Sequence, residues 1–597
     1  MIIKERLKQL RKLMKQHHMD VYIVPTSDFH ETEYVGEYFK ARQFLSGFSG
    51  SNGTLVVTAQ KAGLWTDGRY FIQAKEQLAG SGIDLMKMGG PDTPDLLDYA
   101  VTECEENGIV GFDGRVMNAK TVLELKQKLE SKQGKIAVKY DLVDFIWEER
   151  PALPMAKAFL LDEKYCGQGV KEKLAAIRER LVKENADAIL LNTLDDIAWT
   201  FNLRGFDVKN FPVVLAYAYI SLHKAYLYVE EKKLTTEMKD HFTACGVTVR
   251  PYEQVYEDLP EYSEGRMLMD LGKINYALYN AVTNQAGIID QPNCIQMMKA
   301  VKNETEIEQT IAAHVKDGVA FTKFMYWLKT NVGKMEMTEL SAQQYLENKR
   351  REQDGFIEPS FDTICAYKEH AAMMHYSATI ASNASLQAEG LLLVDSGGQY
   401  LQGTTDITRT MALGTISEQQ RHHFTAVLKS VIHLSKAVFL KGCRGMNLDI
   451  LARGPIWEMG IDYRCGTGHG VGHVLGVHEG PNGFRWKIVP ERNDSCILEE
   501  GMITTNEPGI YIEGSHGIRI ENEMVVRFKE QNEYGTFLRF GTLTVAPIDL
   551  DAIDADMLNQ SEKAWLNAYH RYVFETLSPY LYQDEIDWLK HYTRAIS

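Results

Sequence analysis

The sequence has little of several features that mark common protein classes. Its eight cysteines are scattered along 597 residues, and none belongs to a CxxC pair. In a large acidic chain without a secretion signal, such cysteines are expected to be reduced thiols and not disulfides. Positive charge is also in deficit, because 65 Lys and Arg stand against 81 Asp and Glu, a formal net charge of -16. This balance argues against nucleic acid and anionic membrane surfaces as partners.

Long apolar runs are missing as well. No uncharged stretch reaches the ~18–20 apolar residues of a membrane span. Residues 1–16 have the pattern of an amphipathic helix with charges throughout, and no apolar segment follows them. A signal peptide is therefore not expected, and the cytoplasm is the predicted location.

The chain is long enough for several domains. A length of 597 residues exceeds one ordinary core, and 45% hydrophobic with 24% charged residues is typical of a globular protein. Residues 3–24 and 171–191 share one pattern, an amphipathic helix followed by a strand, and a loop and a Gly-aromatic segment follow each copy. The repeat predicts two related α/β domains with a boundary near residues 151–154.

The second half of the chain has a different pattern. A long helical segment begins near residues 299–303, and helices then alternate with short strands and Gly-rich turns. Residues 551–597 form an aromatic-rich helical tail, which is more typical of a core or a dimer surface than of a cofactor site. We predict an α/β (α+β) fold in four parts: residues 1–152, 153–300, 301–535 and 536–597.

The stretch VDSGGQYLQGTTDITRT (residues 394–410) places an aspartate near each end. The apolar run before it and the pattern of residues 408–411 predict two strands, with glycines as turn material between them. Such a β-hairpin brings Asp395 and Asp406 to the same end of a sheet. Two buried like charges require a cation. The alternative is a polar hairpin with both aspartates in solvent.

Three further stretches supply groups of the same kind. His469 lies among four glycines, which leave its imidazole unobstructed. A Pro-Gly pair forces a turn directly after Glu507. The stretch HGIRIENEMVV alternates as a strand does, so Arg519 and Glu521 are expected to point to the same face. Glu507 and Glu521 thus repeat the arrangement of the two aspartates, with one carboxylate from each arm of a hairpin.

Together, two aspartates, two glutamates and one histidine define a candidate metal centre. Four clustered carboxylates are severely destabilising without metal. Two divalent cations turn them into a hard-oxygen site suited to Mn²⁺, Co²⁺, Fe²⁺ or Zn²⁺. Two such ions ~3.5–4 Å apart can activate a water molecule and polarise a substrate carbonyl.

Two neighbours of the candidate ligands are predicted to have other roles. His473 follows His469 by four residues, but glycines intervene and no glutamate follows His469 as it does in an HExxH site. We therefore expect a structural or supporting role for His473. We expect Cys465 to be a small buried residue and not a ligand.

The motifs DSGGQYLQGTTDITRT, GTGHGVG, VHEGP, NEPG and IRIEN resemble those of the pita-bread metallopeptidases, which include aminopeptidase P, prolidase and methionine aminopeptidase. The chain is most similar to the long, three-domain Xaa-Pro aminopeptidases, and the resemblance covers essentially its whole length. It implies two creatinase-like N-terminal domains, a pita-bread catalytic domain and a C-terminal extension. The family's metal ligands carry over to Asp395, Asp406, His469, Glu507 and Glu521.

The same resemblance implies roles around the metal centre. The family's substrate-contacting and proton-shuttling histidines correspond to His375 and His478, which are expected to stabilise the oxyanion and hold the peptide. Arg519 corresponds to an arginine that supports the Glu521 side of the site. Glu507 is the predicted general base.

The resemblance also bears on substrate binding. His469 is expected to contact substrate as well as metal. Arg69, in TDGRY, corresponds to a first-domain arginine that is expected to reach toward bound peptide. Some relatives carry a histidine where Cys465 stands. If that histidine contacts substrate, we expect a different side-pocket preference here, with the metal site unchanged.

The implied activity is hydrolysis of the bond between an N-terminal residue and a following proline, in peptides with proline at position 2. The implied cofactors are two divalent ions, with Mn²⁺ expected and Co²⁺ or Zn²⁺ as alternatives, and a homodimer is expected. One alternative is a prolidase, which cuts only Xaa-Pro dipeptides. The other is a non-catalytic pita-bread binding module, although such modules have typically lost ligand residues that are all present here.

Overall fold

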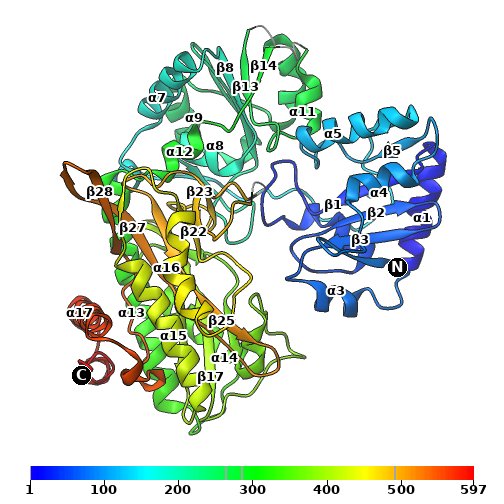
Figure 1. The fold of residues 1–597 in the computed structure, drawn as a ribbon. Coiled ribbons are helices and arrows are strands. Elements are labelled where there is room, and N and C mark those ends of the chain that lie inside the picture. The colour runs from blue at the N-terminus through cyan, green and yellow to red at the C-terminus, as the bar shows by residue number, and fades with distance from the viewer. Residues whose placement is uncertain (1, 263–264, 284–286, 490–491) are drawn as a thin grey trace. The chain divides into compact units, whose positions relative to one another are not determined.

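The computed structural model describes residues 2–262, 265–283, 287–489 and 492–597 (Figure 1). Two compact units divide the chain. Unit 1 comprises Met1–Leu160, Gly169–Lys209 and Val213–Ile295, and unit 2 comprises Leu161–Gln168, Asn210–Pro212 and Gln296–Ser597. None of the helices in the described ranges combines the length and the apolar character that crossing a bilayer requires.

Unit 1 contains two six-stranded sheets of the same design. The first has the order β4-β3-β2-β1-β5-β6 and the second the order β12-β11-β10-β8-β13-β14. In each sheet an inner strand, β1 or β8, is antiparallel to one neighbour and parallel to the other. The strands of the first sheet are β1 (Val21–Pro25), β2 (Thr54–Thr58), β3 (Ala62–Thr66), β4 (Asp84–Lys87), β5 (Ile109–Gly111) and β6 (Lys135–Ala137). Those of the second are β8 (Ala188–Leu191), β10 (Ala216–Ser221), β11 (Ala225–Val229), β12 (Thr248–Arg250), β13 (Met267–Met269) and β14 (Ile288–Asp290).

The helix before each inner strand follows the predicted pattern. Helix α1 (Ile3–Gln16) buries Leu7, Leu10 and Met14, which are spaced to lie on one face of a helix. Helix α7 (Val170–Lys183) precedes β8 in the same way. The helix-strand repeat is therefore confirmed.

Unit 2 is built from helices and antiparallel strands (Figure 1). Its largest sheet has the order β21-β28-β27-β24-β22-β23, and β16, β17 and β20 form a separate sheet. The strands of the large sheet are β21 (Val438–Leu440), β22 (Gly468–Gly470), β23 (Glu479–Phe484), β24 (Ile503–Asn506), β27 (Asn522–Asn532) and β28 (Gly535–Thr542). The smaller sheets contain β15 (Phe356–Pro359), β16 (Ile364–Tyr367), β17 (Leu391–Ser396), β18 (Gly398–Tyr400), β19 (Gly403–Thr404), β20 (Ile407–Ala412), β25 (Gly509–Ile512) and β26 (His516–Arg519).

Helices α13 to α16 accompany these sheets, and α15 and α16 lie side by side (Figure 1). Their bounds are α13 (Glu304–Asn331), α14 (Glu339–Arg351), α15 (Glu418–Ser435) and α16 (Gly445–Trp457). The start of α13 is fixed by a capping box, because the Asn303 side chain accepts from Glu306 N and the Glu306 carboxylate accepts from Asn303 N. The long helix expected after residues 299–303 is therefore confirmed.

The tail packs one apolar side into the core of unit 2, while Tyr572, Tyr580 and Tyr582 are exposed. Helix α17 (Gln560–Leu577) contributes to a hydrophobic cluster with α15 and β26, and α18 (Gln583–Tyr592) also contributes to this cluster. The Tyr569 hydroxyl accepts a hydrogen bond of 2.9 Å from Arg409, a buried residue of β20. The tail thus supports the strand that directly follows Asp406.

Candidate metal centre

The predicted aspartate hairpin is present and buried. Strands β17 and β20 are antiparallel, with Asp395 opposite Thr408, and Asp406 lies directly before β20. Asp395 is 8% exposed and Asp406 is 4% exposed. The alternative of two aspartates in solvent is therefore wrong.

The two aspartates are only partly neutralised by their neighbours. Arg519 donates a hydrogen bond from Nη2 to Asp395 Oδ2. Among the described residues, none donates a hydrogen bond to the buried Oδ1 of Asp395 or to the buried Oδ1 of Asp406. Since buried carboxylate oxygens are nearly always paired, these two are suited to a cation.

A second hairpin supplies the two glutamates. Strands β25 and β26 pair with Gly509 opposite Arg519, so Glu507 precedes one arm and Glu521 follows the other. Glu521 is held at the first hairpin, because its N–H donates to Thr408 O at 3.1 Å and Thr408 Oγ1 donates to its carboxylate at 2.7 Å. The two predicted hairpins therefore meet at Thr408.

The strand that was expected to carry both Arg519 and Glu521 is not continuous. β26 ends at Arg519 and β27 begins at Asn522, because the chain passes from the β25–β26 hairpin into the large sheet. The two side chains still lie on the same side, since Arg519 Nε also donates to Thr408 Oγ1, at 3.2 Å. Arg519 bonds directly to Asp395 and is linked to Glu521 through Thr408, and its expected support of the Glu521 side stays a prediction.

His469 faces the carboxylates from β22. Its Nδ1 lies 2.9 Å from Gly470 O and donates to it, so Nε2 is the ring nitrogen directed at the acids. Nε2 lies 3.5 Å from Asp406 Oδ2 and 3.4 Å from Glu507 Oε1. A histidine that donates its other ring N–H to a backbone carbonyl is typical of a metal ligand.

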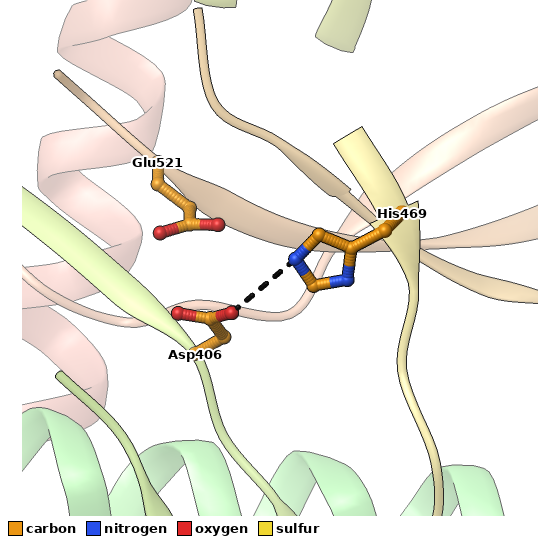
Figure 2. A group of neighbouring side chains, drawn as sticks. All are labelled: Asp406, His469 and Glu521. Atoms are coloured by element: carbon orange, nitrogen blue, oxygen red, sulfur yellow. Dashed lines mark ion pairs between the residues drawn. The ribbon is translucent and has the colours of Figure 1, made fainter. Parts of the chain in front are cut away.

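Figure 2 shows three of these side chains pointing toward one another from separate elements. One ligand atom each from Asp406, His469 and Glu521 lies within 4.8 Å of the others. Burial and then the charge of Asp395 raise the pKa of Asp406 well above its ordinary value. Burial and then the charge of Asp406 do the same to the pKa of Glu521. Bound cations would relieve this crowding of like charges.

The residues present therefore fit divalent metal ions. The site combines unpaired buried carboxylate oxygens, mutually repelling acids and an imidazole nitrogen that faces them. Hard oxygen donors with one imidazole suit Mn²⁺, Co²⁺, Fe²⁺ or Zn²⁺. The assignment of all five predicted side chains as ligands stays a prediction.

The remaining predicted site residues are His478, His375 and Arg69. The exposed ring of His478 packs edge-on against the ring of His469, with centroids 4.4 Å apart. His375 is exposed on the segment that follows β16. Arg69 lies in unit 1, where its guanidinium makes two hydrogen bonds of 2.9 Å to Asp67. The expected contacts of His375, His478 and Arg69 with a peptide stay predictions.

The structural role expected for His473 is confirmed. Its ring nitrogens lie 3.2 Å from Thr310 Oγ1 and 2.9 Å from Tyr165 O, so neither is available to a metal in this arrangement. Cys465 is partly buried, and burial and then the charge of Glu507 raise the pKa of its thiol to about 12. It is outside the cluster of potential ligand atoms found among the described residues.

Two residues that support the centre were missed in the sequence. Glu523 is fully buried, and its Oε1 accepts a hydrogen bond of 2.6 Å from Asp406 N. His314, on α13, lies 3.2 Å from the other oxygen of Glu523. The stretch IENE did contain a signal, because residues two apart on a strand share a face and Glu523 follows Glu521 at that spacing. No sequence pattern indicates His314.

The sequence matches models of four protein regions, in an order that agrees with the fold. The Creatinase/Prolidase N-terminal domain matches residues 6–140 and again residues 149–306. Metallopeptidase family M24 matches residues 308–527, and the C-terminal region of peptidase M24 matches residues 536–596. The metal centre lies within the M24 match, so the fold and the site define a metallopeptidase. The exact boundaries predicted for the four parts stay a prediction.

Relatives match over nearly the full length. "Probable Xaa-Pro aminopeptidase P" of Botryotinia fuckeliana is 39% identical over 604 residues, covering 98% of this chain and 92% of that protein. "Aminopeptidase P2" of Arabidopsis thaliana is 36% identical, covering 100% of this chain and 89% of that protein. The crystal structure of X-prolyl aminopeptidase from Caenorhabditis elegans, described as a cytosolic enzyme with a di-nuclear active site, is 32% identical with a TM-score of 0.93, each chain being covered completely. The chain therefore belongs to metallopeptidase family M24, within the group of the Xaa-Pro aminopeptidases.

Proposed function

We propose that this protein is a metallo-aminopeptidase that hydrolyses the first peptide bond of peptides with proline at position 2. The observation that carries the proposal is the cluster of buried carboxylates around His469, two of which have an oxygen without a hydrogen-bond donor, in a chain that matches Xaa-Pro aminopeptidases over nearly its full length. In the reaction water adds its oxygen to the carbonyl carbon, and the bond to the proline nitrogen breaks. The products are the free first residue and the shortened peptide.

The ligand set proposed for two divalent ions is Asp395, Asp406, His469, Glu507 and Glu521. When bound, such ions lower the pKa of water and polarise the substrate carbonyl. Asp395 is oriented for this role by Arg519, which also donates to the Tyr511 hydroxyl at 2.7 Å. Asp406 is oriented by the bond from its N–H to Glu523.

Glu507 is the proposed general base. Its carboxylate is half-buried at the edge of the centre, and Thr505 Oγ1 lies within 3.3 Å of Oε1. It accepts a proton from the attacking water and then donates that proton to the proline nitrogen as this group leaves. The proton is thus returned within one turnover.

His478 and His375 are the proposed donors to the substrate carbonyl oxygen. Negative charge develops on this oxygen in the transition state, and a fixed N–H donor there lowers the barrier. The exposed position of His478 beside His469 supports this role. Arg69 and His469 are proposed to contact the peptide as well.

The metal, the location and the assembly are further parts of the proposal. We expect Mn²⁺, with Co²⁺ or Zn²⁺ as alternatives, and a cytoplasmic protein like the cytosolic Caenorhabditis elegans enzyme. A homodimer is supported by apolar side chains exposed on α16 and on the segment around residue 486. Trp457 and Trp486, both exposed, lie there with ring centroids 6.3 Å apart. Sedimentation velocity of the wild type and of Trp486→Glu tests this part, and a wild-type monomer would contradict it.

The activity is tested by removing metal with a chelator, adding Mn²⁺, and comparing Arg-Pro-Pro with the dipeptide Arg-Pro. We expect metal-dependent release of arginine from the tripeptide. Cleavage of the dipeptide alone would identify a prolidase. If no peptide is cleaved with any divalent ion, the chain is a binding module and the proposal is wrong.

A further inference from the structure

Glu339, the first residue of α14, is fully buried, and its carboxylate accepts four hydrogen bonds. Oε1 accepts from Tyr367 N and from His370 Nδ1, each at 2.8 Å. Oε2 accepts from the Tyr376 hydroxyl and from Ala384 N, each at 2.9 Å. A carboxylate offers about four acceptor positions, so all of them are in use.

All four donors belong to one stretch of chain, residues 367–384, which we call the His375 segment. Tyr367 and Ala384 are its two ends, and His370 and Tyr376 lie between them. The rings of His370 and Tyr376 also stack on each other, with centroids 4.5 Å apart. Along the chain, His375 lies between His370 and Tyr376 and directly precedes Tyr376. A single buried carboxylate thus fixes both ends of the segment and the residue next to His375.

The other side of the segment lies against the metal centre's own strands. A Cβ atom on Gly517, in β26, would lie 1.7 Å from Ala371 O, so the segment packs directly on this strand. β26 continues to Arg519. The segment also begins at the end of β16, whose Ile364 is paired with Asp395. The His375 segment is therefore held between Glu339 and the strands that carry the ligands.

We propose that Glu339 is a positioning residue for peptide cleavage, which acts by fixing His375 relative to the metal centre. The proposal rests on the proposed function, in which His375 contacts the substrate. It requires a carboxylate at this position. A glutamine would turn an NH₂ group toward two donors in either orientation of its amide, and an aspartate would be too short by one methylene to reach all four.

The first test is Glu339→Gln alone and combined with His375→Ala, with kcat/KM measured on a proline-containing tripeptide. We expect Glu339→Gln to lower kcat/KM by about 10–100-fold, because a catalytic group displaced by about 1 Å loses that much. In the His375→Ala background the same change should have little further effect, since residues that act as a unit are not additive. Independent, multiplying effects would overturn the proposal.

Two additional variants keep the test interpretable. Glu562→Gln is the matched control, because Glu562 is also a buried glutamate at a helix start and accepts from Asn559 N. It should lower the melting temperature without changing kcat/KM per folded molecule. Tyr376→Phe removes one donor of Glu339 and serves if Glu339→Gln does not fold. It should lower kcat/KM in the wild-type background and not in His375→Ala.

Hydrogen–deuterium exchange separates this proposal from the proposed function. Exchange in residues 367–384 should be faster in Glu339→Gln than in the wild type and in Glu562→Gln. Unchanged exchange would overturn the proposal whether or not the protein cleaves peptides. If the wild type cleaves no peptide while exchange is faster in Glu339→Gln, Glu339 still holds the segment in place. It then has no reaction to position, and the claim of a role in catalysis is wrong.

Discussion

Asp317 and Asp406 are both buried in unit 2, at 2% and 4% exposure, but their surroundings differ. Asp317 accepts from Arg350 Nε at 2.6 Å and Nη2 at 3.1 Å, and from the Tyr400 hydroxyl at 2.9 Å. Asp406 Oδ2 lies 3.5 Å from His469 Nε2, and among the described residues none donates a hydrogen bond to Asp406 Oδ1. One aspartate has its counter-charge within the chain, and the other lies among acids.

The comparison separates a structural carboxylate from a functional one. In a fully hydrogen-bonded buried ion pair, each charge already has its partner within the protein, and the role of the pair is structural. A buried group of unpaired acids costs free energy in the metal-free protein, and that free energy is recovered when cations bind. The sign of the effect of neutralising an aspartate should therefore be opposite in the two regions.

The largest effect is expected from Asp406→Asn in the metal centre. This change removes the negative charge of a predicted metal ligand. Replacing a residue that only supports a ligand lowers activity by up to about 100-fold, so the loss for Asp406→Asn should exceed about 100-fold. The metal-free variant should nevertheless be more stable than the metal-free wild type by about 1 kcal/mol or more, because one repelling charge is gone. Steady-state kinetics and urea unfolding after chelation measure both. Lower stability of the metal-free variant would contradict the comparison.

Asp317→Asn should have the opposite effect on stability. It leaves the buried charge of Arg350 without its partner, and loss of one partner of such a pair costs about 3–5 kcal/mol. The cost should be the same with and without metal, and kcat/KM per folded molecule should not change. Urea unfolding with and without Mn²⁺ checks this, and a cost that depends on metal would show that the two regions are not independent.

Arg519→Lys tests an arginine that reaches into the metal centre. Three different nitrogens of Arg519 bond to Asp395, Thr408 and Tyr511, a fork that a lysine cannot reproduce. Metal affinity or activity should fall by about 10–100-fold. Calorimetric titration with Mn²⁺ measures the affinity, and Arg527→Lys, which changes a partly exposed arginine paired with Glu304, is the matched control. Equal affinities for both variants would refute the supporting role.

The smallest effect concerns a buried group that stays neutral. Burial lowers the pKa of His570 to about 3, and its Nε2 accepts from Ile548 N at 3.1 Å. The unfolded chain binds a proton near pH 6.5, whereas the folded chain does not until about pH 3. The contribution of neutral His570 to the free energy of unfolding is therefore fully present above pH 6.5. It is lost as the pH falls toward 3, by up to about 1.4 kcal/mol per pH unit. His570→Gln should reduce the slope of unfolding free energy between pH 6 and pH 5, and an unchanged slope would contradict this assignment.

The fold was predicted to the extent that local patterns determine it. The helix-strand repeat, the start of α13 and the helical tail follow from periodicity and capping residues that the sequence shows directly. The break between β26 and β27 was not predicted, because alternation continues through residues 520 and 521 while the hydrogen-bonding partner changes. Which strand pairs with which is a long-range property that no local pattern contains.

The site was predicted where turn residues accompany acids. Asp395, Asp406 and Glu507 lie close to glycine- or proline-containing turns, and Glu521 belongs to an alternating strand pattern, so their clustering could be inferred. Support from distant elements could not, since Glu339 accepts from residues that follow it by 28 to 45 positions along the chain. Such contacts exist only after the sheets have formed.

The central claim is that the unpaired buried carboxylates bind two divalent ions that peptide cleavage requires. It is tested most directly by titrating the chelated protein with Mn²⁺ and measuring bound metal per chain together with arginine release from Arg-Pro-Pro. We predict saturation at two ions per chain, with full activity reached only there. Cleavage that is complete without metal, or a centre that binds no ion, would contradict the account.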